Sequence, residues 1–225
     1  MKILSILFGT ILLCTGCATS SIQVLEKKEP TRPYTKILAI YLEEGCEFSL
    51  LDSMTYNICI RSCFLKTDTE SIALRSRVED HIARDLTTTG TVVVKSADLF
   101  DSTTNSYTDF LSTIERMSID ALLIVDSRGY LHIEHSSPGM TTPNYAYSPT
   151  GGYHPVSYTH TPADNYSTVN GSFESLLINT KSIAFPVWRA LLETKGKRYN
   201  GKKGLSRSMA GKLAQSLKGS GYIAH

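Results

Sequence analysis

The strongest constraint on the fold is an alternation of strand and helix patterns between residues 36 and 125. Three short apolar runs are typical of buried strands: residues 36–42, 91–94 and 119–125. A helix pattern that opens with the capping-box residues Thr67 and Glu70 and stops at Gly90 precedes the second run. A second helix pattern, at residues 107–117, precedes the third run. This order predicts a sheet on which at least one crossover helix packs.

The second half of the chain adds a hairpin and a final helix. Residues 171–179 and 185–194 are extended patterns separated by a short polar turn. Residues 205–217 carry apolar side chains four positions apart, which predicts an amphipathic helix, and residues 56–60 form a weaker strand pattern. We therefore predict an α/β fold, a mixed β-sheet with about three packed helices, in a single domain over residues 35–220.

The N-terminal residues predict export. An apolar run of about 11 residues, 3–13, is too short for a membrane-spanning helix, which needs roughly 20 residues. Small residues follow it, and Thr15-Gly16-Cys17 resembles a bacterial lipobox. We expect a signal peptide at residues 1–16, removed by cleavage before Cys17, and acylation of Cys17. An uncleaved signal anchor, or an ordinary signal peptide cut elsewhere, is the alternative.

The lipobox predicts a membrane-anchored mature chain. Ala18, and not Asp, follows Cys17, which in enteric bacteria directs a lipoprotein to the outer membrane, facing the periplasm. The polar stretch that follows predicts a tether over residues 17–34. Removing residues 1–16 removes Lys2 alone among charged residues and leaves 22 basic and 21 acidic side chains. This balance gives no electrostatic case for nucleic-acid binding.

Residues 136–169 are unusual because they hold five of the eight prolines. So long a segment without regular structure is rare in a compact domain, and frequent proline interrupts helices and central strands. Tyrosine combines a large contact area with a polar tip, which suits binding surfaces. We expect four tyrosines here to contact a partner: Tyr145, Tyr147, Tyr153 and Tyr158. A poorly ordered surface insertion is the alternative.

Three cysteines besides Cys17 remain in the mature chain: Cys46, Cys59 and Cys63. In an oxidising compartment, one disulfide and one remaining thiol is the simplest arrangement, and the spacing leaves the pairing open. Cys59-x-x-x-Cys63 lacks a second tight pair, which disfavours a metal site.

Other polar side chains do not predict catalysis. Four histidines lie at 132, 135, 154 and 160, but His132 and His135 would face opposite sides of a strand, which favours solvated histidines over a metal site. The basic stretch at residues 195–203 is either a solvated loop or a contact for anionic lipid or cell-wall polymer. The sequence holds no nucleophile elbow, phosphate loop or zinc-protease motif. We expect no cofactor, no metal and no enzymatic activity.

This order of elements behind a lipobox resembles a group of bacterial envelope proteins. Residues 36–42, 86–94, 119–125 and 185–190 carry the resemblance. The group comprises the penicillin-binding-protein activator lipoproteins, the curli-secretion lipoprotein and the N-terminal domain of the Tol-system propeller protein. The resemblance covers roughly residues 35–220 and implies a mixed sheet with packed helices and a binding or scaffolding role. It carries over no catalytic residue.

Together these patterns predict an outer-membrane-anchored periplasmic lipoprotein that acts as a non-enzymatic binding or accessory protein for an envelope protein partner. The alternative is a subunit of an oligomeric envelope secretion or assembly complex, in which copies of the chain associate with one another.

Overall fold

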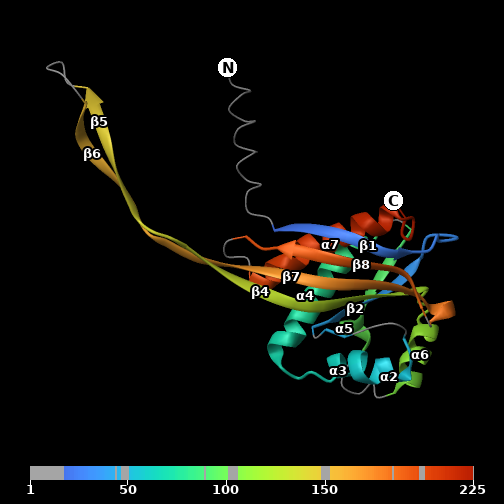
Figure 1. Cartoon of the computed structure of the whole chain (residues 1–225). Helices are drawn as coiled ribbons and strands as arrows, with labels where there is room; N and C mark the ends of the chain where they lie inside the picture. Colours follow the sequence, from blue (N-terminus) through green and yellow to red (C-terminus); the bar gives the residue numbers. More distant parts are fainter. Residues whose placement is uncertain are drawn as a thin grey trace.

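The computed structural model describes residues 18–43, 45–46, 51–88, 90–100, 106–147, 153–183, 185–197 and 201–224. In chain order the elements are β1 (Thr19–Lys27), β2 (Lys36–Leu42), α2 (Ser53–Thr55), the π-helical turn η1 (Tyr56–Ile60), α3 (Arg61–Phe64), α4 (Thr69–Leu86), β3 (Val92–Lys95), α5 (Ser96–Leu99), α6 (Tyr107–Arg116), β4 (Ala121–Ser137), β5 (Met140–Tyr147), β6 (Tyr153–Thr161), β7 (Asp164–Asn179), the 3-10 turn η2 (Thr180–Ser182), β8 (Pro186–Lys195) and α7 (Gly201–Gly219). They form a body of sheet and helices and a long curved arm that leaves one end of it (Figure 1).

The body is built on a six-stranded mixed sheet with the strand order β1-β8-β7-β4-β2-β3. β2 runs parallel to both β3 and β4, while β4, β7, β8 and β1 pair antiparallel. The chain passes through α4 between β2 and β3, and through α6 between β3 and β4. The predicted α/β fold, a mixed sheet with packed helices, is confirmed.

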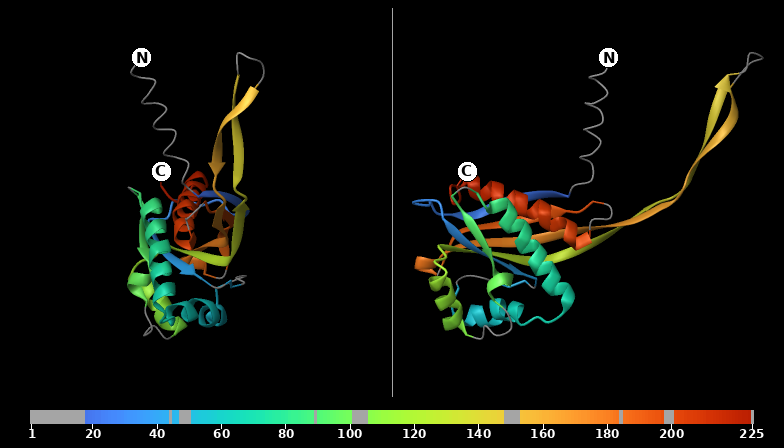
Figure 2. Two further views of the ribbon diagram at one scale, coloured as in Figure 1. Left: turned by 90° about the vertical axis from the view of Figure 1, so that its left-hand side faces the viewer. Right: turned by 180° about the vertical axis from the view of Figure 1, so that it is seen from behind.

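Helices cover both faces of the sheet (Figure 2). Successive residues of β2 point to opposite faces, so Ile37, Ala39 and Tyr41 pack in one core cluster with α4 and α7. Leu38 and Ile40 pack in the other cluster, with η1, α3 and α6. Both faces of the central strands are buried, which explains why residues 37–42 and 121–125 are apolar at every position.

Trp188 lies at the centre of the first cluster. It is fully buried in β8 and belongs to the same cluster as Met209 and Leu213 of α7. Burial of a side chain of this size contributes about 2–3 kcal/mol. The helix predicted over residues 205–217 is confirmed, because α7 spans Gly201–Gly219.

Two local predictions are wrong. Residues 56–60 were expected to form a weak strand, but they form η1, in which Tyr56, Cys59 and Ile60 are buried. An apolar run this short does not distinguish a buried strand from a buried helical turn. The N-cap of α4 is Asp68, whose carboxylate accepts a hydrogen bond from the Ser71 N–H at 2.7 Å. The capping side chain is therefore one residue later than the capping-box reading of Thr67.

The predicted tether over residues 17–34 is also wrong for half of its length. Thr19–Lys27 forms β1, which pairs antiparallel with β8 at the sheet edge. Ile22 packs against the core, and the Ser20 hydroxyl lies 2.7 Å from the hydroxyl of Thr194. A polar sequence makes an edge strand here because the open edge of β8 supplies the hydrogen bonds. The expected signal peptide and Cys17 lie outside the described residues.

Within the part of the chain that the structure describes, no helix combines the length and the apolar character needed to cross a membrane.

Candidate functional site

The most distinctive feature of the molecule is the arm. β4 and β7 continue beyond the sheet as a two-stranded antiparallel ribbon, and β5 and β6 extend it. We call residues 132–169 the arm, of which 148–152 are not described. From Leu131 to Tyr147 one strand spans about 50 Å at roughly 3.3 Å per residue. Residues 136–169 were expected to lack regular structure, and that expectation is wrong. Every strand of a two-stranded ribbon is an edge strand, and edge strands tolerate proline.

The arm starts at a β-bulge in β4. The pairing of β4 with β7 shifts between Ser127 and Gly129, and Gly129 has a φ of +132°. A bulge bends its strand and increases the local twist, and glycine adopts this φ without strain. On the other side of the root, a Cβ at Gly196 would lie 2.2 Å from the Val169 carbonyl oxygen, so only glycine fits where β8 ends against β7. Gly129 therefore permits the bend in β4, and Gly196 permits the close approach of the end of β8 to β7.

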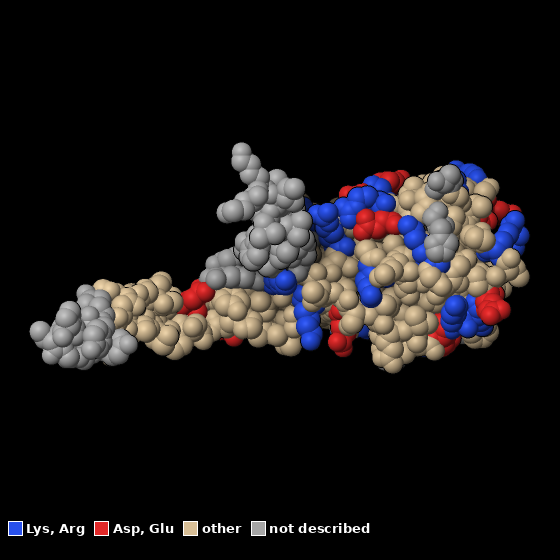
Figure 3. Space-filling view, turned by 90° about the horizontal axis from the view of Figure 1, so that it is seen from above, with Lys and Arg blue, Asp and Glu red and all other residues tan. Residues whose placement is uncertain are grey.

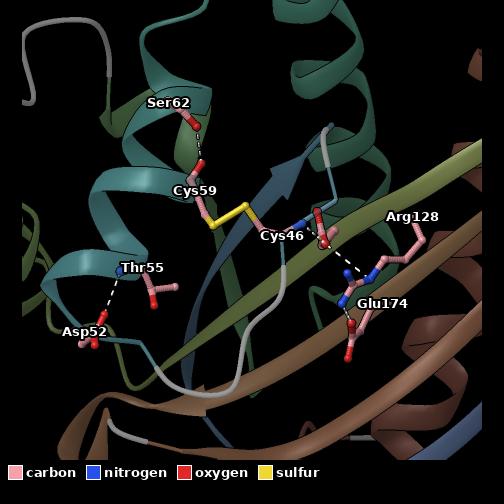
Figure 4. Close-up of a disulfide and its surroundings, with 8 residues drawn as sticks. Cys46, Asp52, Thr55, Cys59, Ser62, Arg128 and Glu174 are labelled. Carbon is pink, nitrogen blue, oxygen red and sulfur yellow. Dashed lines mark hydrogen bonds and ion pairs between the residues drawn. A yellow bond between two sulfur atoms is a disulfide. The ribbon is translucent and has the colours of Figure 1, made fainter.

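A buried charge cluster holds the root. Glu174 of β7 forms an ion pair with Arg128 at the bulge (Figure 4). It forms a second ion pair with Arg189 of β8. The Asp126 carboxylate accepts a hydrogen bond from the Cys46 N–H at 2.8 Å and lies 3.6 Å from the Arg128 guanidinium. Burial raises the pKa of Asp126 to about 6, although the Cys46 N–H and Arg128 act in the opposite direction. The cluster links three strands and the segment that follows β2.

Two carboxyl groups with different environments can form an acid–base pair, and Asp126 and Glu174 face each other across the β4–β7 ladder. Their side chains are 0% and 1% exposed, however, and Glu174 is held between two guanidinium groups. A substrate would have no access to either carboxyl group. The arrangement therefore supports the root and does not form a reaction centre.

The disulfide lies beside this cluster. Cys46 is bonded to Cys59 of η1, so the prediction of one bridge among Cys46, Cys59 and Cys63 is confirmed (Figure 4). Cys63 is a buried free thiol whose Sγ donates to the Tyr41 carbonyl oxygen at 3.2 Å. The bridge ties the segment after β2 to the helical layer, and Cys46 also holds Asp126.

We expect the double substitution Cys46→Ser, Cys59→Ser to lower the unfolding free energy by about 3 kcal/mol, because it opens a loop with a sequence separation of 13. Urea unfolding followed by far-UV circular dichroism measures the change. Cys63→Ala is the matched control and should leave the bridge intact in non-reducing peptide mapping. An unchanged urea midpoint for the double variant would contradict the prediction.

The distal part of the arm has two different faces. Asn144 pairs with Ser157, and Tyr145 pairs with Pro155 after a shift in register. Alternation along each strand then defines a Tyr/Pro face, which includes Pro143, Tyr145, Pro155, Tyr158, strand positions 147 and 153, and the Thr141–His160 pair nearer the root. The opposite, hydroxyl/amide face holds Thr142, Asn144, Ser157 and Thr159. On it the Asn144 amide donates to the hydroxyls of Ser157 at 3.0 Å and Thr159 at 2.9 Å.

The four tyrosines singled out from the sequence occupy positions on one face of this ribbon. Tyr145 and Tyr158 are 58% and 65% exposed. Tyr147 and Tyr153 are paired with each other in the ladder, and for these two the structure describes only the backbone. The register, which sequence reasoning did not supply, is what brings the four positions to one face.

The arm also differs from the body in charge. Residues 135–163 contain no Lys, Arg, Asp or Glu, and neither Lys nor Arg occurs between Arg128 and Lys181. In Figure 3 the body carries scattered basic and acidic side chains, whereas the arm shows only acidic ones near its root. A surface this poor in charge does not select partners by long-range electrostatics.

Three of the four histidines singled out from the sequence, His132, His135 and His160, have separate neighbours. His132 is paired with Val169, whereas the His135 ring stacks on Tyr166 with centroids 4.6 Å apart. His160 lies 3.1 Å from the Thr141 hydroxyl. No group of three or more His, Cys, Asp or Glu that could hold a metal occurs among the described residues.

Sequence reasoning missed a cavity of about 290 Å³ at the end of the sheet away from the arm. Tyr34 and Tyr222, whose rings stack at 6.3 Å, line it together with Asp120, Asn179 and Lys181. The Asp120 carboxylate accepts hydrogen bonds from the N–H groups of Thr35 and Lys36, so it is engaged in holding the start of β2. The residues that line the cavity come from four distant parts of the chain, so no local sequence pattern could have revealed it.

No protein-family model matches the chain, and no curated protein matches its sequence. Among solved structures it is similar to the PelC dodecamer from Paraburkholderia phytofirmans in two crystal forms. The first structure, of a point variant, is 9% identical with a TM-score of 0.43, and the match covers 87% of this chain and 96% of PelC. The second is 10% identical with a TM-score of 0.42, and the match covers 92% of this chain and 100% of PelC. A PDZ domain protein from Parabacteroides distasonis is 11% identical with a TM-score of 0.34, covering 99% of this chain and 40% of that protein. At these values the similarity is weak and assigns neither a family nor a function to this chain.

Proposed function

We propose that the chain is an outer-membrane-anchored periplasmic lipoprotein without enzymatic activity, and that it presents its arm to a partner in the cell envelope. Cys17 carries the lipid, by the lipobox argument, and the body holds the arm in place. The proposal keeps the envelope role that the resemblance to envelope lipoproteins implies.

The arm is the observation that carries this proposal. No residue between 138 and 163 whose side chain the structure describes is buried, so these side chains contribute nothing to the core. An isolated two-stranded hairpin is marginally stable in water. A long ribbon of this kind, projecting from a rigid and well-packed root, is explained by contact with another component.

The second candidate is a subunit of an oligomeric envelope complex, and β1 favours it. Among the strands that the structure describes, β1 pairs only with β8, and residues 19–25 carry no charge. An uncharged edge strand can pair with a strand of another chain. Mass measurement of the detergent-extracted protein distinguishes this candidate, which requires a defined oligomer, from a monomeric accessory protein.

Site-specific photo-crosslinking in cells tests the main proposal. With benzoyl-phenylalanine in place of Thr142 or Tyr158, we expect a discrete crosslinked product from at least one position, because both project from the arm. Ile72, which is 44% exposed on α4, is the control position on the body and should give none. Cys17→Ala should release the chain from the membrane fraction and abolish the product. Membrane association unchanged by Cys17→Ala, or equal products from positions 72, 142 and 158, would contradict the proposal.

A further inference from the structure

We infer that the Tyr/Pro face of the arm is a second membrane contact, which lies in the headgroup layer of the membrane that carries the Cys17 anchor. The inference rests on the proposed lipidation of Cys17. It names phospholipid as the component that this face meets, and it leaves the hydroxyl/amide face to a protein partner.

The anchor and the arm belong to the same end of the sheet. Thr19, two residues after Cys17, pairs with Lys195, which pairs with Asn170, which pairs with Leu131 at the arm root. With strands about 4.8 Å apart, this row places Thr19 about 15 Å from the root. The Ser208 hydroxyl donates to the Ala18 carbonyl oxygen at 2.9 Å, which ties the start of β1 to α7. An acyl chain on Cys17 would therefore hold the arm root within a short distance of the membrane surface.

The arm also bends in the matching direction. In Figure 1, and from behind in Figure 2, it curves toward the side of the sheet on which β1 lies. That edge carries the residues that follow Cys17. A lipid attached to Cys17 would place the membrane on the β1 side of the body. The arm curves toward this same side.

The composition of the distal arm suits a headgroup layer. A charged side chain is costly to place in a bilayer, and residues 135–163 carry no Lys, Arg, Asp or Glu. Tyrosine is enriched where membrane meets water, because its ring is apolar and its hydroxyl remains hydrated. Tyr145 and Tyr158 offer such rings on a single face, and both are largely exposed. One-sided tyrosines on an uncharged ribbon match the chemistry of that layer.

The open edges of the ribbon limit how deep it goes. A two-stranded ribbon leaves backbone N–H and C=O groups unpaired along both edges, and lipid-exposed open edges do not occur in the hydrocarbon region. Water and polar lipid groups satisfy these backbone groups in the headgroup layer. The arm therefore rests at the surface with its Tyr/Pro face down.

The prolines disfavour a second copy of the chain as the occupant. Pro143 in β5 and Pro155 in β6 each lack an N–H. Proline on an exposed edge blocks the addition of a further strand. Both edges of the distal ribbon are protected in this way, so its exposed face, more than its edges, is suited to binding.

Lipid-specific fluorescence quenching tests the inference. The lipidated protein, purified from its own membrane, is placed in phosphatidylcholine vesicles after introduction of Tyr145→Trp or, as the matched control on the opposite face of β5, Thr142→Trp. Trp188 is fully buried and gives a constant background. We expect the Tyr145→Trp emission to shift to the blue and to be quenched several-fold more than that of Thr142→Trp by lipid brominated near the headgroup. Raising the salt concentration should leave this quenching unchanged, because the distal arm carries no charge.

Other results overturn the inference in distinguishable ways. Equal quenching of both positions by lipid brominated near the chain ends would mean that the arm enters the hydrocarbon. No quenching at either position, together with a protein crosslink from position 158 in cells, would assign the tyrosines to a protein and leave the proposed function standing. An intact mass showing an unmodified Cys17 would overturn the proposed function and this inference together.

Discussion

Replacing residues 138–163 with Asn-Gly is expected to leave the body folded and to abolish capture of the arm's partner. Ser137 and Asp164 are paired, so a two-residue turn between them closes the shortened hairpin in register. The Ser136 hydroxyl, 2.8 Å from the Asn165 side-chain oxygen, holds the next pair of the ladder. No side chain that the structure describes in the excised segment is buried, so we expect the unfolding free energy to change by less than about 1 kcal/mol.

Thermal unfolding and capture from the native envelope measure the two effects. The matched control is Tyr145→Ser with Tyr158→Ser, which keeps the ribbon and removes the two exposed rings. If the tyrosines contact lipid, this control keeps its protein partner while the excision loses it. Unfolding of the excised chain would show that the arm supports the core, and an unchanged partner set would move the binding surface to the body.

Glu79→Ala is expected to destabilise the body by about 3 kcal/mol or more. The Glu79 side chain is fully buried in α4, and its carboxylate accepts hydrogen bonds from the Tyr41 N–H at 3.1 Å, the Ser96 hydroxyl at 2.6 Å and the Ala97 N–H at 2.8 Å. Alanine would leave these three donors without a partner in the core. For a chain of this size the melting temperature should fall by about 10 °C. Asp80→Ala is the matched control.

Asp80 is the next residue of α4, and its side chain is 57% exposed in an ion pair with Lys95 at 2.8 Å. Removing a surface pair of this kind costs less than about 1 kcal/mol. Similar melting temperatures for Glu79→Ala and Asp80→Ala would contradict the role assigned to the buried carboxyl group. Calorimetry at one pH is sufficient for this comparison.

The same carboxyl group makes stability depend on pH. Burial raises the pKa of Glu79 from 4.5 to about 7, although hydrogen bonds from Ser96, Ala97 and Tyr41 and the charge of Arg75 act in the opposite direction. The folded state then binds the proton more tightly than the unfolded state, so stability is greatest below pH 4.5 for this group and declines as the pH rises to about 7. Asp126, with its pKa raised to about 6, adds to this decline.

The N-cap carboxylates act in the opposite sense. Hydrogen bonds from Thr55 and Ser71 lower the pKa values of Asp52 and Asp68, so their contribution is lost at more acidic pH. We therefore expect urea midpoints to fall between pH 5 and pH 8 and Glu79→Gln to flatten part of that slope. A midpoint that rises over this range would contradict the assignment.

The central strands and the long helices could be predicted because their signals are local. Residues 37–42 and 121–125 are buried on both faces and are apolar without interruption. Helices α4 and α6 each carry one apolar stripe after a polar N-cap. Periodicity reports which positions must leave water, and these elements bury enough apolar surface to show it. The hairpin of β7 and β8 was predictable for the same reason.

β1 and the arm could not be predicted because their strands depend on partners distant in sequence. β1 forms along the open edge of β8, more than 160 residues away in the chain, and its own sequence is mostly polar. β5 and β6 contain prolines that argue against strands in general, and only their position in a two-stranded ribbon makes them acceptable. The sequence left the disulfide pairing open, and the structure places Cys59 of η1 beside Cys46, whereas Cys63 of α3 is a free buried thiol.

The sequence by itself determined the class of fold, through the periodicity of its apolar residues, and the expectation of a lipid anchor at Cys17. It also determined that residues 135–163 carry no charge and are rich in tyrosine and proline. Only the tertiary structure decided that this segment is a projecting ribbon, that its tyrosine positions share a face, and that its root and the start of β1 lie in one row across the sheet. The physical reason is that burial is visible in the periodicity of apolar residues within a short stretch of sequence. Strand register and sheet order, in contrast, arise from pairing between residues far apart in the chain.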